Sequence, residues 1–243
     1  MRFLLAHITG TGWDDWAFVA GPVVIFIAIA ALLARPRGKD RSPLAAAAHG
    51  LERLTGIPGW TAGAFGTGIG GLTLAMVGFY WDVAWHIDRG RDKALFTPPH
   101  VLILLGLASI LLAAAVGVAL ASAIGTDTKL RFRSLRIPWS ALALGVIGGG
   151  AVMGFPLDDR WHHAYGIDVT MWGPTHLIMI GGASVATVVL WMVLAEGGVK
   201  AVRGTFGFRL HALSAGAALG GLSALQGEFD FGVPQSWPPP ASC

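Results

Sequence analysis

The chain has 243 residues, of which 54% are hydrophobic and only 13% are charged, and its mean hydropathy is +0.63. This composition excludes a soluble domain of the same length and predicts an all-α integral membrane protein. The net charge of +3 comes mainly from a few short polar segments, which favours contact with anionic lipid head groups and argues against a nucleic-acid-binding protein.

Apolar runs of about 20 residues are long enough to cross a bilayer, and the sequence contains six of them. In chain order they predict transmembrane helices at 16–34, 60–81, 100–124, 138–156, 175–195 and 208–226. The first run lacks a preceding basic segment and a following small-residue cleavage site, so we interpret it as a retained helix. We expect one six-helix domain over residues 1–235 and a disordered tail over 236–243.

Basic residues predict how the helices are inserted, because cytoplasmic loops are enriched in Lys and Arg. Alternate loops contain Arg35, Arg37, Lys39, Arg41, Arg53, Lys129, Arg131, Arg133, Arg136, Lys200, Arg203 and Arg209, whereas the two facing loops contain only Arg89, Arg91, Lys93 and Arg160. We therefore expect both termini on the extracytoplasmic side of a prokaryotic plasma membrane.

Two segments, 82–106 and 158–182, carry the same polar residues in the same order at a constant offset of 76 positions. The shared pairs are Asp82/Asp158, Trp85/Trp161, His86/His162, Gly90/Gly166, Asp92/Asp168, Pro98/Pro174, His100/His176 and Gly106/Gly182. Each copy predicts a helical hairpin, one over about 60–124 and the other over 138–195. Because both hairpins run in the same direction, they are expected to be parallel repeats.

The spacing within each copy predicts that its Asp and His side chains converge. Asp82 and His86 are four residues apart and therefore share one face of a helix. Pro98 lies two residues before His100, and proline is favoured in the first turn of a helix, so the chain should turn and re-enter as a new helix. This returns His100 to the level of His86, and the second copy repeats each position.

Imidazole and carboxylate groups without thiolates are typical ligands of copper, iron, zinc or manganese. We therefore predict a metal site at the extracytoplasmic face, either one shared dinuclear site or two mononuclear ones, with copper favoured. The predicted ligands are Asp82, His86, His100, Asp158, His162 and His176.

Five further residues are candidates to support the ligands from outside. Asp92 and Asp168 could cap the returning helices, ligate a metal directly or orient a histidine. Trp85 and Trp161 either belong to an interfacial aromatic belt or shield the site. His163 follows one predicted ligand directly.

The pattern Asp82-x3-His86 followed by His100 resembles the Asp-x3-His-x12-His copper-ligand set of the C subunit of particulate methane and ammonia monooxygenases. In this chain thirteen residues separate the histidines, and the set occurs twice. The resemblance implies copper and O2 chemistry within a bundle of membrane helices.

The spacings His86-x13-His100 and His162-x13-His176 are similar to the paired histidines of dihaem cytochrome b. That resemblance implies two stacked haems held by uninterrupted helices, with the histidines of each helix about 20 Å apart. The sequence between them contains charged residues and Pro98, Pro99 or Pro174, which argues against a straight helix.

These observations favour metal-dependent redox chemistry, in which an unidentified redox partner or another membrane subunit supplies electrons. Several alternatives remain open: a dihaem b-type electron carrier, a metal-binding protein without catalysis, a cation- or proton-coupled transporter, and a purely structural hydrogen-bonded network. Helices at 100–124 and 175–195 contain few polar residues beyond their outer ends, which argues against a transport path.

Overall fold

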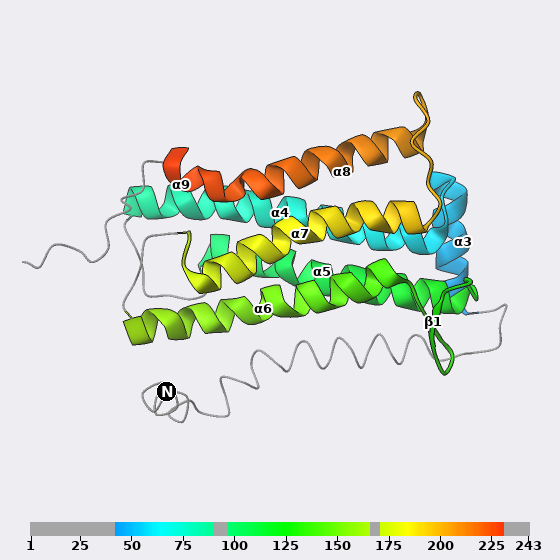
Figure 1. Ribbon diagram of the computed structural model, residues 1–243, viewed down its shortest axis with the longest axis horizontal. Helices are drawn as coiled ribbons and strands as arrows, with labels where there is room; N and C mark the ends of the chain where they lie inside the picture. Colours follow the sequence, from blue (N-terminus) through cyan, green and yellow to red (C-terminus); the bar gives the residue numbers. More distant parts are fainter. Residues whose placement is uncertain (1–41, 90–96, 166–170, 231–243) are drawn as a thin grey trace, which may run out of the picture.

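The computed structural model describes residues 42–89, 97–165 and 171–230, which form an all-α bundle with one small β-hairpin (Figure 1). The helices in chain order are α3 (Pro43–Thr55), α4 (Gly59–Arg89), α5 (Pro98–Ala123), α6 (Trp139–Tyr165), α7 (Pro174–Glu196), α8 (Phe206–Ser223) and α9 (Gly227–Asp230), with a 3₁₀ turn, η1 (Ala224–Gln226), before α9. Strands β1 (Leu130–Phe132) and β2 (Leu135–Ile137) pair antiparallel between α5 and α6.

Four of these helices, α4 to α7, are long and apolar enough to cross a membrane, and they correspond to the second to fifth predicted spans. The first predicted span, 16–34, and the tail 236–243 lie outside the described residues. The sixth prediction overlaps α8, which contains Arg209 and His211 and is not among the four. Six spans and a pseudo-axis relating two repeats remain predictions.

Two elements were missed because they lie in segments read as polar loops. Helix α3 is capped by the Ser42 hydroxyl, which accepts a hydrogen bond from the Ala45 N–H at 3.0 Å, and it ends at Gly56 with φ of 70°. The strands β1 and β2 form a hairpin with Arg133 at its turn, where φ is 55°. Both elements lie at the end of the bundle opposite the C-terminal end of α4 (Figure 1).

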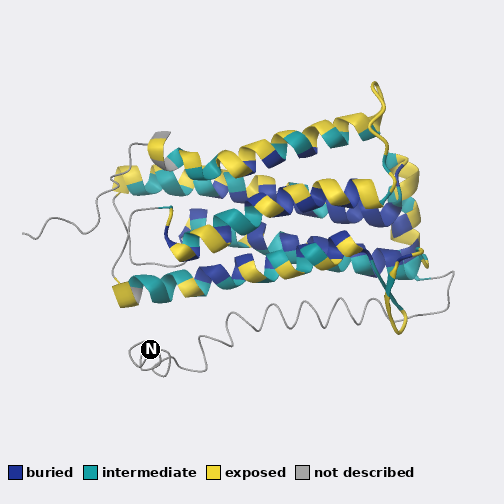
Figure 2. Ribbon diagram, in the orientation of Figure 1, coloured by how far each residue is buried: buried dark blue, intermediate teal, exposed yellow. Residues whose placement is uncertain are grey.

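The core is formed by aliphatic side chains where α4 to α7 meet. Leu107 and Ile110 of α5, Leu144 of α6, and Leu190 and Leu194 of α7 are almost fully buried. Many large apolar side chains on the outward faces are exposed instead (Figure 2). An apolar exterior around a packed interior is what helices in contact with lipid require, because lipid tails solvate such surfaces.

Glycines allow the two helices of each hairpin to approach closely next to the duplicated segment. A Cβ atom placed on Gly78 would lie 2.8 Å from the Leu102 Cβ atom, and one on Gly154 would lie 2.6 Å from the Met179 Cγ atom. Gly78 and Gly154 are 76 positions apart, and each lies four residues before an aspartate of interest. The close contact brings the end of one helix against the start of the next.

The N-terminus of α6 and the C-terminus of α7 are joined by a carboxylate. Glu196, the last residue of α7, accepts hydrogen bonds from the backbone N–H groups of Trp139 and Ser140 at 2.8 and 2.9 Å, and from the Ser140 hydroxyl at 2.5 Å. These backbone donors belong to the first turn of α6 and have no partner within their own helix. The negative charge also lies favourably at a helix N-terminus.

We expect Glu196→Ala to lower the free energy of unfolding by about 1 to 2 kcal/mol, because the first-turn donors of α6 lose their acceptor. Thermal unfolding in detergent measures the effect. The control is Glu52→Ala, which removes an exposed carboxylate whose one ion pair, to His49, is 3.9 Å long, and should change stability by less than about 0.5 kcal/mol. Equal destabilisation by both substitutions would contradict this account of Glu196.

Candidate metal centres

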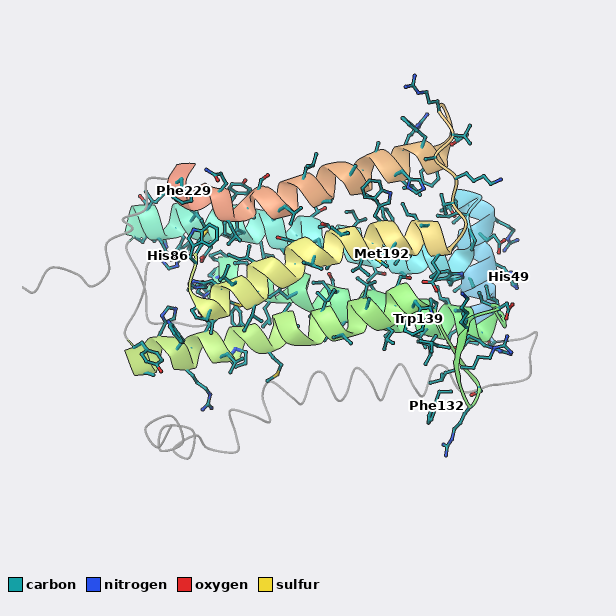
Figure 3. The ribbon with its side chains drawn as sticks, viewed as in Figure 1. His49, His86, Phe132, Trp139, Met192 and Phe229 are labelled. Carbon is teal, nitrogen blue, oxygen red and sulfur yellow. The ribbon has the colours of Figure 1, made fainter. Side chains whose placement is uncertain are left out.

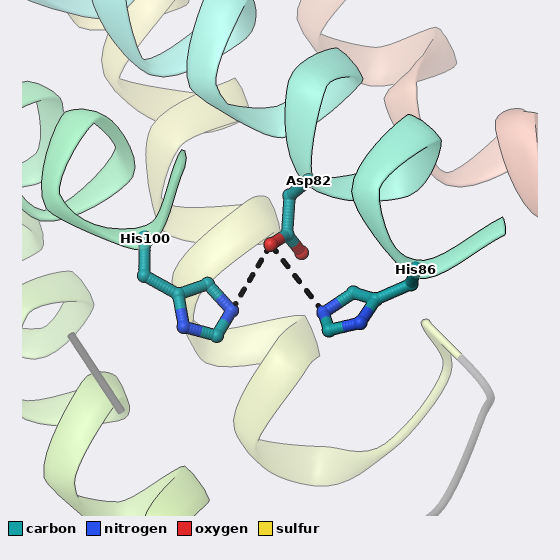
Figure 4. Close-up of side chains that lie close together, drawn as sticks. All are labelled: Asp82, His86 and His100. Carbon is teal, nitrogen blue, oxygen red and sulfur yellow. Dashed lines mark ion pairs between the residues drawn. The ribbon is translucent and has the colours of Figure 1, made fainter. Parts of the chain in front are cut away.

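The first cluster forms where α4 ends and α5 begins. Asp82 and His86 lie one turn apart on α4, and His100 is the third residue of α5. The carboxylate lies between the two imidazoles, with its Oδ1 atom 3.4 Å from His86 Nε2 and 3.1 Å from His100 Nε2 (Figure 4). The centroids of the two rings are 6.0 Å apart. One carboxylate oxygen thus faces two ring nitrogens from two helices.

The second cluster has the same composition at the corresponding ends of α6 and α7. Asp158 Oδ2 lies 3.2 Å from His162 Nε2, and Asp158 Oδ1 lies 3.3 Å from His176 Nε2. The two imidazole centroids are 5.8 Å apart. We call these two clusters the Asp82 triad and the Asp158 triad. Both lie at the end of the bundle that contains His86, opposite His49 (Figure 3).

Each triad could hold a metal ion, since one donor atom from each of its three residues lies within 4.8 Å of the others. The side chains are partly enclosed, with 16 to 22% of their surface exposed. Within the described part of the chain, every such group draws its residues from a single hairpin. The geometry therefore gives two separate three-residue sites, not one group of mixed ligands.

The Asp82 carboxylate has an enclosed oxygen that the protein leaves unsatisfied. Asp82 Oδ1 is buried and accepts no hydrogen bond in the described structure, although two imidazole nitrogens lie within 3.4 Å. Leaving such an oxygen without a donor costs about 1 to 3 kcal/mol or more, because its hydration is lost. A cation held between the carboxylate and the two imidazoles would supply the missing interaction.

In the Asp158 triad, the carboxylate does accept a hydrogen bond from the protein. The hydroxyl of Thr175, a buried residue next to His176, donates a hydrogen bond of 2.5 Å to Asp158 Oδ1. The equivalent position in the first hairpin is Pro99, which has no donor. The two triads are therefore similar in ligands but different in what supports the carboxylate. Thr175 was missed from the sequence because the two copies differ at that position.

Proline fixes where the second helix of each hairpin starts. Pro98 and Pro174 are the first residues of α5 and α7, as their spacing predicted. The first turn of each of these helices therefore lies at the level of a triad. The first helices are longer than expected. Helix α4 continues past the predicted end at residue 81 to Arg89. Helix α6 contains Pro156, where the predicted span ends, and continues to Tyr165. The aspartates and the first histidine of each copy therefore lie on a helix, as their four-residue spacing predicted.

Of the five residues expected to support the ligands, the structure describes the side chains of Trp85 and Trp161. The Arg89 guanidinium lies 4.0 Å from the centre of the Trp85 ring, and Trp161 packs against Tyr165 with ring centroids 4.4 Å apart. Trp85 therefore lies beside a cationic side chain and Trp161 beside an aromatic one, near the C-terminal ends of α4 and α6. Asp92 and Asp168 lie outside the described residues, as does the side chain of His163.

Phe155 links the two hairpins next to the triads. It lies on α6 three residues before Asp158, is 7% exposed, and packs edge-on against the imidazole of His100 with ring centroids 5.9 Å apart. The sequence offered one signal for this contact, a large aromatic residue one turn before a duplicated aspartate. The apolar ring of Phe155 therefore limits the orientations open to the His100 imidazole.

The dihaem arrangement is wrong for this fold. It requires the two histidines of each pair to lie about 20 Å apart on one continuous helix. His86 and His100 instead lie on separate helices with ring centroids 6.0 Å apart, and His162 and His176 repeat this arrangement. The Nε2 atoms of each pair converge on one carboxylate instead.

The chain matches no family model, no curated protein and no solved structure in the comparisons made. The chemistry of the site is therefore inferred from its own geometry.

Proposed function

We propose that this protein is a membrane metalloprotein in which each triad binds one transition-metal ion. The observation that carries the proposal is the Asp82 carboxylate, whose enclosed oxygen lies between two imidazole nitrogens without accepting a hydrogen bond. Three donors that converge from two helices leave other coordination positions open to water or to a reactant. Support also comes from the recurrence of the same three residue types in the second hairpin.

The metal we favour is copper, with iron as the second candidate. Two imidazoles with one carboxylate suit both ions, and the described ligand sets contain no thiolate that would favour a purely structural zinc site. Both ions change oxidation state, so the proposed activity is redox chemistry with O2 as the oxidant. In a monooxygenation, one oxygen atom enters the substrate and the other leaves as water, which requires two electrons and two protons from a reduced partner. The partner is a redox protein or another membrane subunit.

The chain's own residues have defined parts in this proposal. The histidines offer Nε2 atoms as ligands, the aspartates offer negative charge to balance the ion, and Thr175 orients one carboxylate. The predicted orientation places the triads at the extracytoplasmic boundary of the bilayer. A transported cation would need polar groups along the bundle, yet the described residues that are buried and polar are only Ser and Thr. This favours chemistry at one end over transport.

The first prediction concerns metal stoichiometry. We expect about two metal ions per chain in protein purified in detergent, about one in either His86→Ala or His162→Ala, and essentially none in the double variant, because each site loses one of only three ligands. Elemental analysis measures the metal content. His49→Ala, which alters an exposed histidine at the opposite end of the bundle, should retain both ions. Full retention by the double variant would show that other residues bind the metal.

The second prediction concerns Thr175. Thr175→Val removes the hydrogen bond that orients Asp158, and we expect it to weaken metal binding at that triad about tenfold or more. The measurement is a competition titration against a chelator in the His86→Ala background, where only the Asp158 triad remains. The matched control is Thr97→Val, since Thr97 lies at the start of α5 and its hydroxyl has no hydrogen-bond partner within the described structure. If both substitutions weaken binding equally, the orienting role of Thr175 is wrong.

The third prediction separates redox chemistry from simple metal binding. We expect an absorption or electron paramagnetic resonance signal of copper or iron that disappears on anaerobic reduction and returns on exposure to O2. The double histidine variant serves as the control and should show no such signal. Stoichiometric zinc, or a signal that does not respond to O2, would contradict the redox function and leave a metal-binding protein.

A further inference from the structure

The bundle contains an apolar cavity of about 250 Å³ on the inner side of the triads. Its walls come from α4, α5, α7 and α8 and from the turn η1. Helix α8 packs along α7 (Figure 1). A wholly apolar cavity of about 150 Å³ holds benzene. This cavity therefore has room for a somewhat larger apolar molecule.

The three hydroxyl groups in the cavity wall already donate their protons to backbone carbonyl oxygens. Thr73 donates its hydroxyl to the Ile69 carbonyl oxygen at 2.8 Å, and Thr187 donates to the Ser184 carbonyl oxygen at 2.6 Å. The Ser184 hydroxyl lies 2.5 Å from the Gly221 carbonyl oxygen and 2.7 Å from that of Ile180. Because these hydroxyls have no proton left to donate, a ligand whose polar groups need hydrogen-bond donors would lose its hydration without compensation.

The cavity also lies directly next to the ligands of both triads. On three helices a wall residue is three positions, or about 4.5 Å along the helix, inward of a triad residue. The pairs are Phe79 and Asp82 on α4, Ile103 and His100 on α5, and Met179 and His176 on α7. An apolar molecule in this cavity would thus lie at the base of the two metal centres.

Access to the cavity is lateral. Thr73 on α4 and Gly220 on α8 both line the cavity and are both exposed on the surface of the bundle. A Cβ atom added to Gly220 would meet no atom within 4 Å, so the missing side chain leaves open space at this point. This opening lies beside the candidate membrane span α4, so a molecule dissolved in the hydrocarbon core could reach the cavity without crossing water.

From this placement we propose that the cavity binds a small, membrane-dissolved aliphatic molecule as the substrate of the metal centres. The proposal rests on the proposed metal function for its chemical consequence. The binding itself depends only on the shape and apolar character of the cavity. A free aliphatic molecule fits better than a phospholipid acyl chain, because the cavity lies between helices that carry the ligands and has no charged side chain in its wall to hold a head group.

Photolabelling tests the proposal on the full chain in lipid nanodiscs. The probe is decane carrying a diazirine, and mass spectrometry maps the attached label. We expect labelling of Met76, Phe79 and Met179 above the level on outward-facing residues of the same helices, and we expect excess unlabelled decane to suppress it. The same pattern is expected after the metal has been removed with a chelator. Labelling that is uniform over the apolar surface, or that resists competition, overturns the proposal.

A pair of glycine substitutions on α8 provides the matched comparison. Gly220→Phe places a ring into the cavity and should reduce the specific labelling by about fivefold or more. Gly216→Phe makes the same change one turn earlier, at an exposed glycine that also has open space but does not line the cavity, and should leave the labelling unchanged. Equal effects of the two substitutions overturn the proposal.

A phospholipid with a diazirine in its acyl chain distinguishes the other occupant. If this lipid labels the cavity more strongly than the decane probe does, the cavity holds a lipid tail and the substrate proposal is wrong. Metal content measured on the same samples keeps the two proposals separate. Specific labelling without metal supports the cavity alone, whereas metal without specific labelling supports the metal centres alone.

Discussion

Each hairpin depends on the attraction between one carboxylate and two imidazoles at the end of an otherwise apolar bundle. Asp82 joins His86 on its own helix to His100 on the next, and Asp158 does the same for its hairpin. Ionisable groups are costly among membrane helices unless they are paired or coordinate an ion. The bundle can contain these groups because helix packing brings them together at one end of the bundle, where each side chain remains about one fifth exposed.

That packing is itself a consequence of missing side chains. Gly78 and Gly154 remove the atoms that would hold the second helix of each hairpin away, and the proline at the start of that helix fixes the position of its histidine. An alanine at Gly78 would place a Cβ atom 2.9 Å from the Ile103 backbone nitrogen. The distance between the two helices of each hairpin is thus set by close contact at a glycine, and this distance positions the side chains of the triad.

The parts of this arrangement that were predictable from sequence have strong local causes. Long apolar runs fixed the positions of α4 to α7, and Pro98 and Pro174 fixed two helix starts. The helix ends were less predictable, because Asp82 and His86 interrupt the apolar run without interrupting the helix. The close neighbour of Asp82 on α5 is His100, and a local sequence pattern does not contain a contact between helices. The short helix α3 and the β1–β2 hairpin were missed for a related reason, since polar segments between spans read equally well as loops.

Duplication revealed the ligands but concealed their differences. Comparison of the two copies selects positions that are identical, so it found the Asp and His residues and passed over Thr175, whose counterpart is Pro99. Within the described residues, Asp158 Oδ1 has a hydrogen-bond donor, which is Thr175, and Asp82 Oδ1 has none. A carboxylate that already accepts a hydrogen bond is held in one orientation with or without an ion. One that lacks a donor gains its missing interaction only when a cation binds, so the stability of the first hairpin should depend on the metal more strongly than that of the second.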